Sequence, residues 1–130
     1  MDSNTKISIP VSVGELYDKY SILLIKQKKI TDNDKLVCIN NEINLLKNII
    51  MSIPFFNQNL LEELIYINTI LWDIEDNIRI KEKYKEFDKE FIDLARNVYF
   101  TNDKRFEVKN KINQIYNSNI FEVKSYQSYL

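Results

Sequence analysis

The chain has 130 residues, of which 45% are hydrophobic and 28% are charged, with 18 Lys and Arg against 19 Asp and Glu. These proportions are typical of a single folded domain, exclude a disordered chain, and give no basic excess that would indicate nucleic acid or an anionic membrane as the main partner. The single cysteine excludes an internal disulfide, and the lack of histidine removes the usual zinc ligands and the commonest general base, so any catalysis would use carboxylates, lysine, tyrosine or a hard metal.

The class of fold follows from the scarcity of helix breakers. One glycine and two prolines in the whole chain favour long helices over a sheet with many turns. The sequence therefore predicts an all-α protein: about five helices with a long central one, in a single domain over residues 1–130. A signal-peptide pattern is missing at the N-terminus and no apolar run approaches about 20 residues. We therefore expect a cytoplasmic protein with no membrane partner.

The N-terminal region changes its hydrophobic period near residue 14. Lys6–Val13 (KISIPVSV) alternates apolar and polar residues and contains Pro10, so residues 1–13 are predicted to be an extended arm or an edge strand. From Gly14 to Ile30, apolar side chains recur every three or four residues, which predicts the first helix.

Two further helices follow. The second is predicted over about Asp34–Met51, with Asp32 or Asn33 as its N-cap, and it ends before Pro54. The third, over about Gln58–Tyr84, has an apolar seam sustained for nearly three heptads, which makes it the expected central helix.

The C-terminal third is predicted to hold two shorter helices and an extended tail. EFDKEFIDLARNVY (86–99) supplies the fourth helix, and TNDKRFEVKNKINQIY (101–116) the fifth, with Thr101 or Asn102 as its cap. The bundle thus spans residues 14–116. The tail, 117–130, alternates as a strand does, and pairing with the N-terminal arm is expected.

The stretch LWDIEDNIR (71–79) carries unusual charge for a helix with a buried seam. Asn68, Trp72, Glu75 and Arg79 are spaced four, three and four residues apart and form a stripe, with Asp76 beside it. Charges at the edge of a buried arc need partners or water. Either they line a polar site, or Glu75 and Arg79 form an intrahelical ion pair beside a tryptophan of the core.

Two other polar groups are candidates for the same site. GELYDK places Glu15, Asp18 and Lys19 in the first turn of the first helix, where the helix dipole alone also favours acids. The fifth helix aligns five polar residues in one stripe: Asn102, Arg105, Lys109, Asn113 and Tyr116. Such a stripe is usually a solvated face, but two cations one turn apart, near a helix N-terminus, also suit a phosphate or a carboxylate.

Five segments carry a resemblance to a known family. They are VGELYDKYSILLIK (13–26), LWDIEDNIR (71–79), LARNVYFTNDKR (94–105), KNKIN (109–113) and EVKSY (122–126). On these, the chain resembles a family of short uncharacterised proteins of bacteria and large DNA viruses, often encoded near glycan-biosynthesis genes. The resemblance implies a shared purpose for the polar positions and a place in glycan metabolism.

We expect the polar stripes to converge on a pocket for an anionic small molecule that resembles a phosphate, a nucleotide or a sugar nucleotide. Arginines and lysine would bind the anion, an aromatic ring would stack on the ligand, and acids would orient the cations. The candidate residues are Glu15, Asp18, Lys19, Trp72, Glu75, Asp76, Arg79, Arg96, Tyr99, Asn102, Asp103, Arg105 and Lys109.

Two other functions stay open at this point. Glu15 and Asp18 with Glu75 and Asp76 would suit magnesium in an all-α nucleoside triphosphate pyrophosphatase, although that class shows a second pair of acids on its first helix. A helical interaction module that forms a homodimer is the non-enzymatic alternative, since the chain is rich in Tyr and Phe.

Overall fold

The computed structural model describes residues 5–130, which form four helices: α1 (Val13–Lys29), α2 (Asn33–Ser52), α3 (Gln58–Lys83) and α4 (Lys89–Ile115). No strand is present among these residues. The all-α prediction is confirmed, and the number of about five helices is wrong. Residues 1–4 of the predicted arm lie outside the described part of the chain. None of the helices in residues 5–130 is long and apolar enough to cross a membrane.

Each helix begins after a side chain that caps it. The capping oxygens accept hydrogen bonds from backbone N–H groups of the first turn, which otherwise have no partner. The four caps are Ser12, Asp32, Asn57 and Asp88. Of the predicted caps, Asp32 for the second helix is confirmed, and the bounds predicted for the first three helices agree with the structure to within one residue.

The predicted fourth and fifth helices are one continuous helix, α4. Thr101 and Asn102, one of which was predicted to cap the fifth helix, are helical, as is Asp103, because each costs at most about 0.7 kcal/mol of helix propensity and no Gly or Pro interrupts the run. Tertiary contacts offset this cost: Thr101 is buried, and Asp103 accepts a hydrogen bond from the Tyr129 hydroxyl. The helix N-terminus expected near Arg105 is therefore absent.

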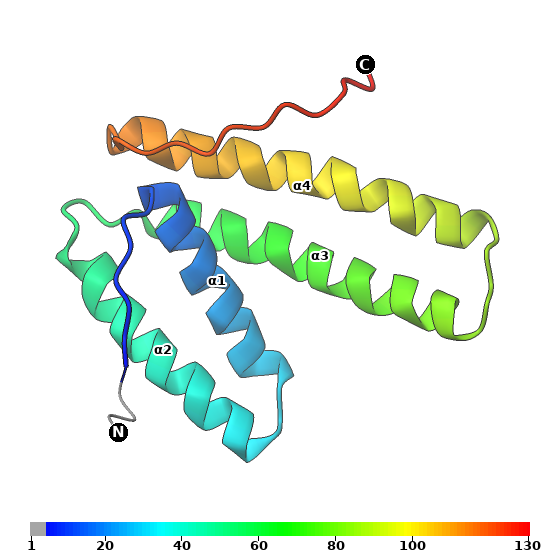
Figure 1. Cartoon of the computed structure of the whole chain (residues 1–130), viewed down its shortest axis with the longest axis horizontal. Helices are drawn as coiled ribbons and strands as arrows, with labels where there is room; N and C mark the ends of the chain where they lie inside the picture. Colours follow the sequence, from blue (N-terminus) through cyan, green and yellow to red (C-terminus); the bar gives the residue numbers. More distant parts are fainter. Residues whose placement is uncertain (1–4) are drawn as a thin grey trace.

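The four helices form two hairpins that cross (Figure 1). α1 contacts α2, α3 and α4, whereas α2 packs mainly on α1. The helix predicted over 58–84 is present as α3, but the prediction that it is the one long central helix is wrong. α3 has 26 residues and α4 has 27, and the two lie side by side as a hairpin. The shortest helix, α1, occupies the centre, and the far half of the α3–α4 hairpin extends beyond it.

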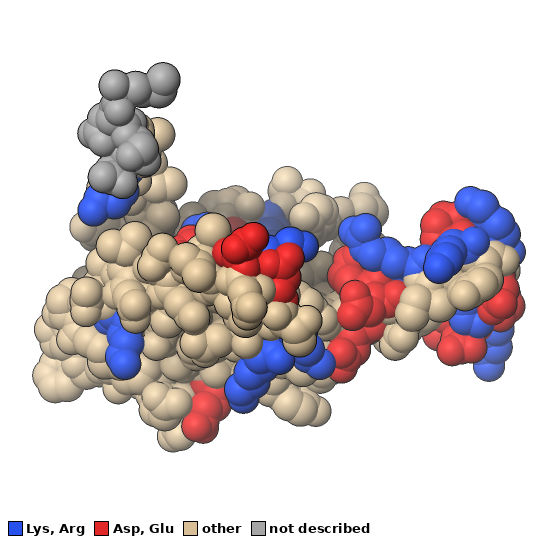
Figure 2. All heavy atoms as spheres, turned by 90° about the horizontal axis from the view of Figure 1, so that it is seen from below, with Lys and Arg blue, Asp and Glu red and all other residues tan. Residues whose placement is uncertain are grey.

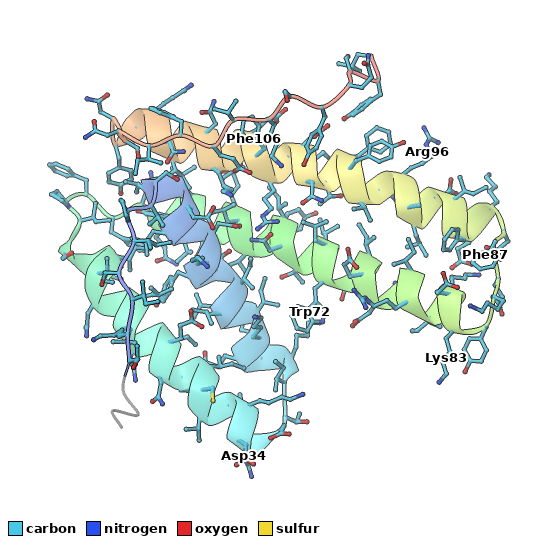
Figure 3. All side chains as sticks on the ribbon, viewed as in Figure 1. Asp34, Trp72, Lys83, Phe87, Arg96 and Phe106 are labelled. Carbon is cyan, nitrogen blue, oxygen red and sulfur yellow. The ribbon has the colours of Figure 1, made fainter. Side chains whose placement is uncertain are left out.

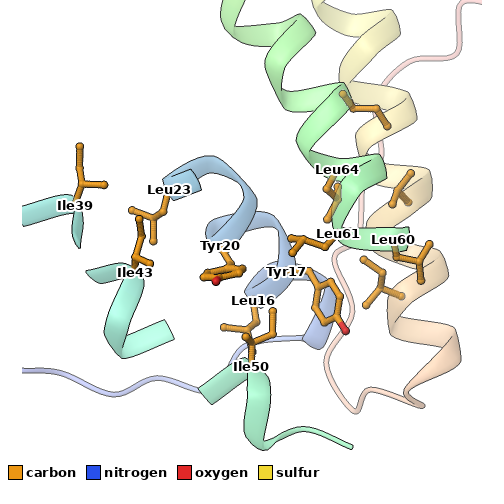
Figure 4. Packing of buried hydrophobic residues seen from close by; sticks show 13 residues of the cluster. Leu16, Tyr17, Tyr20, Leu23, Ile39, Ile43, Ile50, Leu60, Leu61 and Leu64 are labelled. Carbon is orange, nitrogen blue, oxygen red and sulfur yellow. The ribbon is translucent and has the colours of Figure 1, made fainter. Parts of the chain in front are cut away.

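The core lies where α1 meets the other helices (Figure 4). Tyr17, Ile50, Leu64 and Ile112 are completely buried in it. The Tyr17 hydroxyl lies 2.7 Å from the Tyr116 hydroxyl and accepts a hydrogen bond of 3.0 Å from the Asn57 backbone. Apolar packing of α1 thus ends at a polar contact that joins three segments of the chain.

Within residues 5–130, the two terminal segments do not pair with each other as strands. The C-terminal segment runs back along α4, whereas the N-terminal segment leads away from α4 (Figure 1). The expected pairing is therefore wrong, because side chains of the tail, among them Glu122 and Tyr129, contact α4 instead.

Charge is unevenly spread over the surface. On the face in Figure 2, Lys, Arg, Asp and Glu gather toward the end of the α3–α4 hairpin, whereas the part over α1 and α2 is mostly uncharged. One group at the hairpin end is Lys81, whose ammonium lies 3.0 to 3.1 Å from the carboxylates of Glu86, Asp88 and Glu90. These pairs close the turn between α3 and α4 and lie away from α1.

Candidate functional site

A buried carboxylate, Asp18 of α1, is the centre of a polar network between α1, α3 and α4. Its side chain is 1% exposed. Asp18 Oδ1 accepts hydrogen bonds of 2.9 Å from Asn68 Nδ2 and from Arg105 Nε, and Oδ2 accepts one of 2.5 Å from Arg105 Nη2. Asn68 Nδ2 also donates to Ser21 Oγ at 2.8 Å. Both carboxylate oxygens are thereby satisfied inside the protein.

The charges of this network set the protonation of Asp18. Burial alone raises the pKa of a carboxyl group, but hydrogen bonds from Arg105 and Asn68, together with the charges of Arg105 and Lys109, outweigh it. The pKa of Asp18 therefore lies below its ordinary value of 3.8. The hydrogen bonds that Arg105 donates to Asp18 raise the pKa of Arg105, because they outweigh the opposite effect of burial. The pair is ionised at neutral pH.

The ammonium group of Lys109, one helical turn after Arg105, lies among three carboxylates. Its Nζ atom is 2.7 Å from Glu122 Oε2, 2.9 Å from Glu15 Oε2 and 3.8 Å from Asp18 Oδ2. Burial lowers the pKa of Lys109, and the contacts with Glu122 and Glu15 more than reverse this, so the pKa is raised. Glu122 and Lys109 thus join the C-terminal tail to the network.

α1 and α4 approach closely beside this network because the chain has its one glycine there. The Gly14 N–H donates a hydrogen bond of 2.6 Å to Asn113 Oδ1. A Cβ atom on Gly14 would lie 2.5 Å from the Lys109 carbonyl oxygen and 2.9 Å from Asn113 Oδ1. Only glycine permits this contact, which sets the distance between Glu15 and Asp18 on α1 and the cations of α4.

An open groove of about 370 Å³ lies over the network. Its walls come from the second half of α1, the middle of α3 and the middle of α4. Trp72 forms part of one wall, and Glu75 and Asp76 stand at its exposed edge. The complete lining is Ile22, Ile25, Asn68, Leu71, Trp72, Glu75, Asp76, Asn102 and Arg105. Arg105 therefore joins the buried carboxylate to an accessible space.

A smaller polar cavity of about 60 Å³ lies between α4 and the C-terminal tail. It shares Asn102 and Arg105 with the groove. Its other walls are Phe106, Lys109, Glu122 and Lys124.

The structure brings eight of the thirteen predicted site residues together. Four of them form the charged network: Glu15, Asp18, Arg105 and Lys109. Four others line the groove: Trp72, Glu75, Asp76 and Asn102. The polar stripe of α4 faces α1, so its interpretation as a solvated face is wrong: Lys109 is 5% exposed and Asn113 1%. The carboxylates that its cations hold belong to the chain itself.

The other five predicted residues lie elsewhere. Lys19 is exposed on α1, and Arg79 is 79% exposed and lies 3.6 Å from Glu75, as the intrahelical pair predicted. Arg96 stacks on Phe100 on the far side of α4 from Trp72 (Figure 3). Tyr99 and Asp103 contact Tyr129 of the tail. These residues do not line the groove.

Several residues of the network were missing from the predicted site. Asn68 belonged to the predicted stripe on the third helix, but its spacing gave no sign that it points at Asp18. Glu122 and Lys124 lie in the EVKSY segment, and nothing in the local pattern indicates contact with Lys109, 13 residues earlier. Such contacts depend on how the tail folds back, which periodicity does not specify.

Comparison with known proteins gives one match. Residues 6–130 match the model of a family of unknown function (DUF6165). No curated protein and no solved structure matches the chain. The resemblance to an uncharacterised family is confirmed, and both its occurrence in bacteria and large DNA viruses and its link to glycan genes stay predictions.

Proposed function

Because this chain belongs to a family of unknown function, DUF6165, we propose its function from the site alone: it binds a small molecule with one anionic group in the groove between α1, α3 and α4. The observation that carries this proposal is the pairing of Asp18 with Arg105 beneath the groove. Asp18 engages Nε and Nη2, and Nη1 donates one long hydrogen bond of 3.5 Å to Asn102 Oδ1, which leaves its second N–H for a ligand. A guanidinium held in this way is already oriented for a ligand oxygen.

The remaining walls favour a ring that carries hydroxyl groups. Trp72 offers an apolar surface on which a flat or sugar ring stacks. Glu75 and Asp76 offer carboxylate oxygens to hydroxyl or amino groups at the open edge. Because two acids accompany one arginine, a ligand of high negative charge is repelled. A sugar with a single phosphate or carboxylate fits better than a nucleoside triphosphate, and it suits the predicted role in glycan metabolism.

The magnesium-dependent pyrophosphatase interpretation has less support. Asp18 is engaged by Arg105, and Glu15 by Lys109, so neither carboxylate is free for a metal. Within residues 5–130, no three His, Cys, Asp or Glu side chains are grouped closely enough to hold a metal ion. Glu75 and Asp76 remain, and they stand at the edge of the groove.

Tryptophan fluorescence provides a direct test, because Trp72 is the only tryptophan and it lines the groove. We would titrate the protein with sugar phosphates, sugar acids, sugar nucleotides and nucleoside triphosphates, each with and without magnesium. We expect a saturable change with a singly phosphorylated sugar or a sugar acid, independent of magnesium. Magnesium-dependent release of pyrophosphate from a triphosphate would instead support the enzyme.

The variants must spare the buried pair. Asn102→Asp places a negative charge beside Arg105 Nη1 and should weaken binding at least about tenfold, since like charges in an interface cost several kcal/mol. Asn97→Asp is the matched control, because it makes the same substitution at an exposed position of α4 outside the groove. Equal affinity of the two variants, or no response of Trp72 to any compound, would refute the proposal.

A further inference from the structure

The C-terminal segment 119–130 is attached to the helices by side chains. Within the described chain, no backbone hydrogen bond joins this segment to α4. Its side chains contact α4 through the ion pair of Glu122 with Lys109, the stacking of Lys124 on Phe106, and Tyr129, which donates a hydrogen bond to Asp103 and packs its ring on Tyr99 and Phe100. Because a few side chains hold it, this segment can separate from α4 without unfolding a helix.

The cavity beneath this segment is built for negative charge. Lys109 is 5% exposed, and Arg105 and Lys124 also line the cavity, whereas Glu122 is the only acid in its lining. Glu15 and Asp18 approach the same cations from α1 and are fixed there by a helix. Glu122 is therefore the one carboxylate of the network that can leave.

We propose that this cavity is a second binding site, for an oxyanion of phosphate size, and that Glu122 occupies the place of this ligand until the ligand displaces it. Arg105 and Lys109 of α4 would hold the oxyanion, with Asn102 as a neighbouring amide donor. Displacement of Glu122 releases the C-terminal segment from α4. The site shares Arg105 with the groove, but its occupation requires no ligand beside Trp72.

A tethered carboxylate competes with the ligand, so its contact lowers the apparent affinity. The Glu122 side chain is 33% exposed, and a partly exposed ion pair of this kind changes an equilibrium by about fivefold. We therefore expect Glu122→Gln to bind phosphate about fivefold more tightly than the wild type. Glu63→Gln, on the exposed surface of α3, is the matched control and should leave the affinity unchanged.

A second variant separates release of the segment from loss of a charge. Tyr129→Phe removes the hydrogen bond to Asp103, keeps the ring, and changes no residue that lines the cavity. It should also tighten phosphate binding, because it weakens the hold of the segment on α4.

The experiment combines calorimetric titration with limited proteolysis of the full chain. Inorganic phosphate and glycerol phosphate would be titrated at constant ionic strength, to distinguish a free anion from the phosphate group of a larger molecule. Trypsin cleavage after Lys124 reports release of the segment, and cleavage after the exposed Lys6 is the internal control. We expect phosphate to accelerate cleavage after Lys124 and to leave cleavage after Lys6 unchanged.

The outcomes divide clearly. Tighter binding by both Glu122→Gln and Tyr129→Phe, with faster cleavage after Lys124 on addition of phosphate, supports the proposal. Equal affinity of Glu122→Gln and Glu63→Gln, or phosphate that leaves cleavage after Lys124 unchanged, overturns it. Because Trp72 is not part of this assay, a failure here is distinct from a failure of the groove.

Discussion

Replacing Asp18 by asparagine tests whether the buried network is as tightly coupled as its geometry indicates. The substitution keeps the shape but removes the charge that faces Arg105 and Lys109, and it sets an amide N–H against one of the arginine donors. Removal of one partner of a buried pair costs about 3 to 5 kcal/mol. Arg105 is 28% exposed and reaches water in the groove, so the lower end, about 3 kcal/mol, is expected.

Urea unfolding at neutral pH, followed by Trp72 fluorescence, measures this loss. Asp73→Asn is the matched control on α3: its carboxylate is 60% exposed, 3.7 Å from Lys29, and should contribute less than about 1 kcal/mol. A loss at Asp18 no larger than that at Asp73 would refute the network as a coupled unit.

The pH dependence provides a second check with a definite sign. The pKa of Asp18 is lower in the folded chain than its ordinary value of 3.8, so its contribution to stability is fully present above that value. The contribution is lost as the pH falls through the lowered pKa. The difference in unfolding free energy between wild type and Asp18→Asn should therefore be constant near neutral pH and should shrink below a pH of about 4. A difference that persists undiminished in strong acid would contradict the assignment.

Three further substitutions test the architecture, each by urea unfolding. Gly14→Ala should destabilise the protein by about 2 kcal/mol, because the new Cβ would meet the Lys109 carbonyl oxygen at 2.5 Å; a gain from helix propensity would show that α1 can shift. Tyr17→Phe should cost about 1 to 2 kcal/mol, since it removes the hydroxyl that faces Tyr116 in the core, and an unchanged midpoint would contradict that contact. Asn102→Ala should change stability by less than about 0.5 kcal/mol if α4 is continuous, whereas loss of an N-cap would cost about 1 kcal/mol.

The accuracy of the predicted fold follows the strength of the local patterns. The first three helices have long apolar periods bounded by a turn or a proline, so their limits were predictable. Thr101–Asp103 resembles a cap in sequence, but a cap forms only where the chain changes direction. Here burial of Thr101 against the rest of the protein keeps the chain helical. The central position of α1 was also not predictable, because all the helices have similar apolar stripes and periodicity does not specify which helices pack against each other.

The candidate site shows the same division. Spacing placed Arg105 and Lys109 on one stripe with Asn102, and the structure keeps that stripe together. The spacing does not indicate which carboxylates contact Arg105 and Lys109, because Asp18 is 87 residues from Arg105 along the chain. Arg79 is a predicted site residue because it lies on the stripe with Trp72, and Arg96 because it lies in the LARNVYFTNDKR segment, but their helical positions direct both away from the groove.

The buried network is better explained by orientation of Arg105 than by stability. A buried ion pair gains little over apolar side chains of the same size, even though removal of one partner is costly, because desolvation of two charges cancels most of their attraction. Apolar side chains such as Leu16, Leu23 and Ile43 serve the contact of α1 with α2. Apolar side chains of α4, Val108 and Ile112, also belong to the core that α1 forms, but at Asp18 the contact between α1 and α4 is charged. There Asp18 fixes a guanidinium at the base of an open groove, which is the arrangement that the proposed binding of an anionic ligand requires.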